Sequence, residues 1–161
     1  MSTVKETIKN SVELKSMDRN VTNLIISSNS CNELKSLNLN EYKLLKSIEI
    51  GDDCFRSANG FVINGLNELK SLKIGKNSFT FLKSGEEWTK NVANSGNRSF
   101  SISNCVELES IEIGSYSFSD YGGGFELKNL PKLTTIKIDS HNFCYSSFEI
   151  RGIINVYIAN D

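Results

Sequence analysis

The side chains that could perform chemistry are few in this chain and do not form a recognisable catalytic set. A Ser/His/Asp triad would have to use His141, because it is the only histidine. A β-helix enzyme that cleaves polysaccharides needs acidic and basic residues gathered in one groove, whereas Asp52, Asp53 and Asp120 are scattered along the sequence. We therefore expect no catalysis and no cofactor, and we interpret His141 as a structural hydrogen-bonding residue.

The cysteines show neither a CxxC pair nor the spacing of a metal site. Cys31 and Cys105 fall at positions where the chain repeats an apolar residue, and Cys54 and Cys144 each lie beside a phenylalanine. We expect buried free thiols that pack as small apolar groups, rather than disulfides or metal ligands.

The dominant pattern is an internal repeat of about 24 residues, interrupted once. Its motif is apolar-x-x-apolar-x-apolar, followed by a polar or aromatic position and, in most copies, a phenylalanine; the copies begin at Val21, Leu45, Leu69, Leu108 and Leu133. Each repeat also has an earlier apolar-x-apolar pair, at Val12/Leu14, Leu37/Leu39, Phe61/Ile63, Phe100/Ile102, Phe125/Leu127 and Phe148/Ile150. Because such alternation places two side chains inward on a strand, the sequence predicts a β-rich solenoid with two short parallel strands per coil.

This repeat resembles the leucine-rich-repeat family, and within it the BspA-like class, whose repeats have a second strand and a late aromatic residue. The asparagine typical of the family, whose side chain forms a ladder between coils, is matched at Asn29 and Asn77 and approximated by Asp53. Tyr116 and His141 occupy the same position in later repeats, so the resemblance does not imply a continuous side-chain ladder there. The resemblance implies a right-handed superhelix and a family used for many kinds of binding.

The repeat boundaries predict a single domain over residues 1–161, with a short helical N-terminal cap, five coils, one insertion and a partial terminal coil. The cap spans residues 1–11 and the five coils span residues 12–147, which include the insertion at about 80–99. The partial terminal coil spans residues 148–161. The helix is predicted from a capping box formed by Thr3 and Glu6 and from the apolar pair Val4 and Ile8.

Two surfaces are candidates for binding a protein partner. The first is the insertion, whose Trp88 is suited to an interface hot spot, although an alternative is that Phe81, Leu82 and Trp88 cover the flank of the solenoid as a lid. The second is the outward row of the motif strand, where charges alternate; this row could specify strand register, recognise a partner, or do both. The predicted partner-binding residues are Phe81, Glu86, Glu87 and Trp88 in the insertion and Ser47, Glu49, Ser71, Lys73, Ser110, Glu112 and Lys137 on the strands.

Two glycine features are also predicted. A glycine follows the motif strand in several repeats, at positions 51, 75 and 114, where it would serve either close backbone approach or a positive φ angle. The stretch Tyr121–Gly124 is predicted to be a flexible connection, since it lacks the context of a phosphate-binding loop.

Charge and hydropathy narrow the classes of partner. The net charge of −1 gives no reason to expect nucleic acid or an anionic membrane as a partner. As written, the chain shows no signal peptide and no apolar run of membrane-spanning length, so we expect a cytoplasmic, non-catalytic module that binds a protein. The alternative is a fragment of a surface or adhesive repeat protein that binds a host, matrix or glycan ligand.

Overall fold

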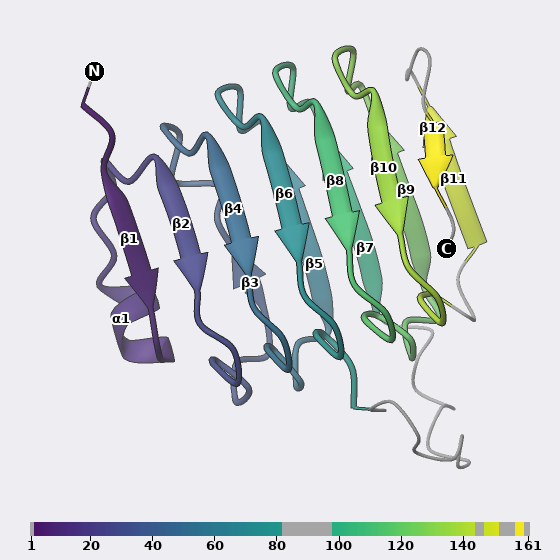
Figure 1. Ribbon diagram of the computed structural model, residues 1–161, viewed down its shortest axis with the longest axis horizontal. Coiled ribbons are helices and arrows are strands. Elements are labelled where there is room, and N and C mark those ends of the chain that lie inside the picture. Colours follow the sequence, from purple (N-terminus) through teal and green to yellow (C-terminus); the bar gives the residue numbers. More distant parts are fainter. Residues whose placement is uncertain (1, 82–97, 144–146, 152–156, 160–161) are drawn as a thin grey trace.

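The chain forms two parallel β-sheets with very little helix (Figure 1). The computed structural model describes residues 2–81, 98–143, 147–151 and 157–159. Sheet A has the strand order β1 (Lys5–Ile8), β2 (Asn23–Ile26), β4 (Ser47–Ile50), β6 (Ser71–Ile74), β8 (Ser110–Ile113), β10 (Thr135–Ile138) and β12 (Tyr157–Ala159). Sheet B has the order β11 (Ser147–Arg151), β9 (Gly124–Lys128), β7 (Ser99–Ser103), β5 (Gly60–Asn64) and β3 (Leu37–Asn38). The single described helix, α1, spans Ser11–Lys15.

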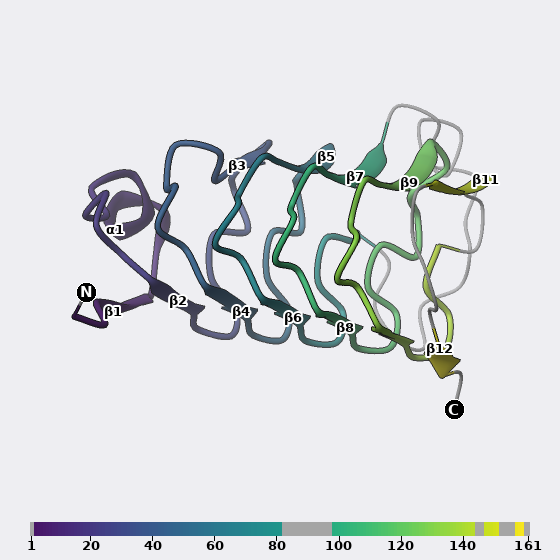
Figure 2. The ribbon, with the colours of Figure 1, turned by 90° about the horizontal axis from the view of Figure 1, so that it is seen from above.

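From β2 onward, the chain alternates between the two sheets, which form two rows in Figure 2. Before the insertion, equivalent residues of neighbouring repeats are 24 positions apart, as in the bond from the Cys54 amide to Ser78 Oγ. Across the insertion, the equivalent bond from the Ser78 amide to Ser117 Oγ joins residues 39 positions apart. The insertion therefore lengthens one connection without shifting the register of the strands on either side.

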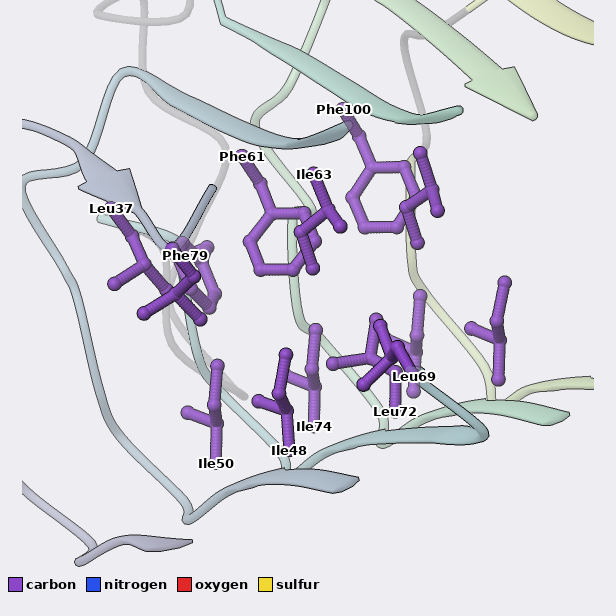
Figure 3. Close-up of a cluster of buried hydrophobic side chains, with 14 of the residues drawn as sticks. Leu37, Ile48, Ile50, Phe61, Ile63, Leu69, Leu72, Ile74, Phe79 and Phe100 are labelled. Carbon is purple, nitrogen blue, oxygen red and sulfur yellow. The ribbon is translucent and has the colours of Figure 1, made fainter. Parts of the chain in front are cut away.

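Apolar residues from both sheets meet in one continuous core (Figure 3). The strands β4, β6 and β8 each bury their second and fourth residues, which is the alternation that the sequence predicts. The first apolar residue of each motif copy is also fully buried, at Val21, Leu45, Leu69, Leu108 and Leu133.

Phenylalanines form two stacked columns through this core. The late phenylalanines Phe55, Phe79, Phe118 and Phe143 stack in succession, with ring centroids 4.9, 4.7 and 5.0 Å apart. The strand phenylalanines Phe61, Phe100 and Phe125 stack at 5.0 and 4.9 Å. Edge-to-face contacts, such as that between Phe100 and Phe118 at 5.0 Å and 81°, join the two columns. Since both geometries are favourable for aromatic pairs, the columns tie neighbouring repeats together.

The position that the sequence predicts for the asparagine ladder carries a ladder of backbone hydrogen bonds. The residues at this position are Asn29, Asp53, Asn77, Tyr116 and His141, and their φ angles are 55 to 62°. The backbone amides of the first four donate to carbonyls of the following repeat at 2.8 to 3.0 Å. Asn and Asp tolerate this left-handed conformation better than most residues. Tyr116 and His141 adopt it as well, and their rings stack at 4.5 Å. The backbone ladder therefore continues where the asparagines stop.

Side-chain hydrogen bonds form a ladder at the next residue of each repeat. Ser78 Oγ donates to the Gly51 carbonyl at 2.9 Å, and Ser117 Oγ donates to the Gly75 carbonyl at 2.6 Å. Cys54 occupies the equivalent position with its thiol, 3.2 Å from the Ser27 carbonyl. These short donors satisfy carbonyls at the turns between repeats, where the strand ladder has ended.

The predicted N-terminal helix is wrong in its position. Residues 5–8 form strand β1, which pairs with β2, and the helix α1 begins later, where Asn10 Oδ1 accepts the Glu13 amide at 2.9 Å. Val12 was expected to point inward from a strand, yet it lies on α1 and is 74% exposed. Pairing with the edge of sheet A outweighs the local capping signal of Thr3 and Glu6, because a strand there satisfies a row of backbone groups on β2.

Candidate interaction surface

The outer face of sheet A brings together most of the predicted binding residues. The register aligns Glu49, Lys73, Glu112 and Lys137 in one row across β4, β6, β8 and β10. A second row contains the residues that begin the same strands, which are Ser47, Ser71, Ser110 and Thr135. Glu49, Lys73 and Glu112 are exposed, and Lys137 is partly buried. The two rows form a flat, polar face.

Two shallow hollows lie on this face. One, of about 450 Å³, is lined by residues of both rows from β2 to β8, including Ser71, Lys73 and Glu112. The other, of about 440 Å³, lies toward the ends of β6, β8 and β10 and includes Gly75 and Gly114. The small side chains along the face leave room for contacts with the charged row.

The glycines that follow the strands allow close approach between neighbouring repeats. A Cβ atom on Gly75 would lie 2.7 Å from the carbonyl carbon of Gly51, and one on Gly114 would lie 2.7 Å from the amide nitrogen of Lys76. Neither glycine has a positive φ angle; among the described glycines only Gly65 does. The positive-φ alternative is therefore wrong for this column, and its glycines are required by backbone packing.

The base of the insertion is fixed by a buried ion pair. Arg98 donates to Asp120 Oδ2 at 2.7 Å, and both side chains are nearly inaccessible to solvent. The same carboxylate oxygen accepts the Phe81 amide at 3.2 Å, so it holds the two residues that flank the segment 82–97. Phe81 is 40% exposed, and its ring lies 4.1 Å from the guanidinium of Arg98.

The other insertion residues predicted to bind a partner, Glu86, Glu87 and Trp88, lie outside the described residues, as does Leu82. The alternatives of a binding loop and a lid therefore both stay open for Trp88. Sequence reasoning did not single out the Arg98–Asp120 pair as a site. A signal for it was present, because Asp120 occupies the repeat position equivalent to Phe81 and Arg98 immediately follows the interruption of the period.

The stretch Tyr121–Gly124 begins with a core residue rather than a flexible link. Tyr121 is fully buried, its ring packs edge-to-face on Phe118, and its hydroxyl donates to the Ala58 carbonyl at 2.9 Å. Gly124 begins strand β9. The prediction of a merely flexible connection is wrong for Tyr121, because its ring packs against the aromatic column and its hydroxyl is hydrogen-bonded.

The residues considered for catalysis lie in different environments. His141 is exposed on a turn, Asp52 Oδ1 accepts the Lys76 amide at 2.9 Å, and Asp120 is bound to Arg98. Within the described ranges, no group of three or more His, Cys, Asp or Glu side chains is placed to hold a metal ion.

The described cysteines are buried free thiols, as expected: Cys31, Cys54 and Cys105. Burial raises the pKa of Cys31 to about 11 and also raises the pKa values of Cys54 and Cys105. A raised pKa keeps a thiol protonated and weakly nucleophilic, so these three residues are suited to packing. Cys144 lies outside the described residues.

Comparison with protein-family models, with curated proteins and with solved structures finds no match to this chain. In the part of the chain that the structure describes, no helix has the length and apolar character needed to cross a bilayer. Function must therefore be argued from the surfaces themselves.

Proposed function

We propose that this chain is a leucine-rich-repeat solenoid of the BspA-like class that acts as a non-catalytic protein interaction module. The proposed binding elements are the outer face of sheet A and the insertion that contains Trp88. The partner is a protein that contacts the polar rows of the face and the aromatic residues of the insertion.

The observation that carries this proposal is the outer face of sheet A, where charged side chains and small hydroxyl side chains lie in register over four successive strands of the sheet. A face built on a parallel sheet presents side chains at fixed spacing and loses little backbone conformational entropy on binding. The buried ion pair that holds Phe81 and Arg98 provides a fixed base for the insertion. The face of sheet A therefore offers a partner contacts at fixed spacing.

Binding is tested by affinity capture with the intact chain, followed by titration calorimetry with the purified partner. Ser71→Arg introduces a bulky charge in the centre of the sheet A face, and Ser101→Arg introduces the same change on β7 of sheet B as a matched control. Trp88→Ala tests the insertion, and we expect it to weaken binding by about 2 kcal/mol or more if the ring is a hot spot. We expect Ser71→Arg to weaken binding and Ser101→Arg to leave it unchanged.

A chain in which residues 83–96 are replaced by a short Gly/Ser link separates the two elements. Circular dichroism should show that the sheets are retained, because loop length changes closure entropy only slowly. If neither the shortened chain nor Ser71→Arg binds the partner less tightly than the intact chain, both proposed elements are excluded.

A further inference from the structure

The charged row of sheet A is complementary to itself. In register, the row reads Thr7, Ile25, Glu49, Lys73, Glu112, Lys137 and Ala159 from β1 to β12. Read in the opposite direction, the four charged positions each have the opposite charge, and Ile25 and Ala159 flank them on either side. A row with this property can pair with a second copy of itself.

We propose that the outer face of sheet A binds a second copy of this chain, face to face, about a two-fold axis that runs parallel to the strands between β6 and β8. Rotation about this axis keeps each row opposite the same row of the partner copy. It places Lys73 opposite Glu112 of the second copy, and Glu112 opposite Lys73. Glu49 and Lys137 then lie opposite each other in the same way. A two-fold interface is self-complementary by construction, which is the property that this row has.

The geometry of the face fits such pairing. Neighbouring strands are about 4.8 Å apart and packed sheets about 10 Å apart, a separation that extended Lys and Glu side chains span together. Lys73 and Glu112 are exposed, and among the described residues no ion pair joins Lys73 to Glu49 or to Glu112 within one chain. The exposed residues just before β6 and β8, Lys70 and Glu109, are opposite in charge as well.

The charge pattern also selects this axis over the alternative. A two-fold axis perpendicular to the strands would place each strand opposite itself, so that Glu49 would face Glu49 and Lys73 would face Lys73. Like charges held together in an interface are unfavourable. Because the contacts are mainly between exposed charges, which salt screens, we expect a weak dimer whose population depends on protein concentration and salt.

This inference deepens the proposed function and rests on its view of sheet A as a binding face. The test is sedimentation velocity of the full chain at low salt, with protein up to about 1 mM, the concentration range that detects weak association. Lys73→Glu and Glu112→Lys each place like charges across the axis twice, and each should weaken the dimer about tenfold or more. An equimolar mixture of the two variants should restore dimers, because every pair across the axis is then of opposite sign. Lys128→Glu on β9 of sheet B is the matched control and should dimerise like the unaltered chain.

The double variant Lys73→Glu/Glu112→Lys separates dimerisation from strand register. It restores opposite charges across the axis, yet within the chain it places like charges side by side at positions 49 and 73 and at 112 and 137. We expect it to dimerise as the unaltered chain does. A monomeric unaltered chain at low salt, or a mixture of the single variants that stays monomeric, would overturn the proposal, with circular dichroism showing that each variant is folded. Either result leaves the proposed function standing, since that is judged by calorimetry with a different protein.

Discussion

Phe118 belongs to the column of late phenylalanines and also contacts Phe61 and Phe100 of the other column. Its truncation is therefore the sharpest test of how the repeats are held together. The ring is fully buried and stacks between the rings of Phe79 and Phe143 at 4.7 and 5.0 Å. Its edge-to-face contacts are with Phe61, Phe100 and Tyr121, at 5.8, 5.0 and 4.9 Å. The contacts with Phe61, Phe79 and Phe143 join this repeat to its neighbours.

Phe118→Ala should lower the free energy of unfolding by about 3 to 5 kcal/mol, which is the usual cost of removing a buried phenyl ring. Phe118→Leu keeps most of the volume but loses the ring pairs, each worth about 0.5 to 1.5 kcal/mol and not additive, so we expect about 2 kcal/mol. Residue 118 has a φ angle of 54°. Leu and Ala meet a similar backbone penalty there, so their difference reports on packing.

Urea denaturation followed by circular dichroism measures these changes, and Val62→Ala, at a residue 45% exposed on β5, is the control with an expected effect within about 0.5 kcal/mol. Amide hydrogen exchange should show that Phe118→Ala lowers protection most on β5 and β7, the strands whose Phe61 and Phe100 rings contact the lost ring. If Phe118→Ala were no more destabilising than Val62→Ala, the columns would not be what joins the repeats.

Three further perturbations have expected outcomes. Ile113→Asp should unfold the protein or its C-terminal repeats in thermal melts, because an unpaired buried carboxylate costs several kcal/mol, whereas Glu112→Ser should cost under about 1 kcal/mol; equal effects would contradict the strand register. Asp120→Ala should lower the free energy of unfolding by about 3 to 5 kcal/mol in urea, since it leaves a buried arginine unpaired, and a neutral result would count against the ion pair. Burial raises the pKa of Cys31 from 9.0 to about 11 and raises the pKa of Tyr121 as well. Both groups therefore stabilise the fold fully below pH 9.0, and chemical denaturation should show stability falling as the pH rises from 9.0 toward 11; constant stability over that range would contradict it.

The repeat made the strands and the core predictable from sequence. An alternating apolar pattern that recurs at a nearly constant spacing identifies the inward residues several times independently. The prediction is therefore correct even for the divergent first copy, which begins at the buried Val21. The coarse architecture of parallel sheets followed from the same spacing. The residues on the outer face of sheet A were also placed correctly, because outward positions are fixed once the inward ones are known.

The errors occurred where long-range contacts override local signals. The sequence of residues 5–8 predicts part of a capped helix, but this segment pairs with the edge of β2 and forms a strand. Tyr121 precedes three glycines and was interpreted as part of a loop, although a hydroxyl acceptor at Ala58, 63 positions away, allows its burial. The Arg98–Asp120 pair depends on contacts across the insertion that no short window of sequence contains.

The structure also bears on whether the alternating charges of sheet A serve register or recognition. Register is already fixed several times over, by the buried alternation of the strands, by the stacked phenylalanines and by hydroxyl donors such as Ser78 and Ser117. The close approach of backbones at Gly75 leaves little freedom for the repeats to slip. Lys73 makes no ion pair with either glutamate beside it on the sheet, among the residues that the structure describes. The exposed charges of Lys73 and its two neighbouring glutamates therefore support the proposal that this face contacts another molecule.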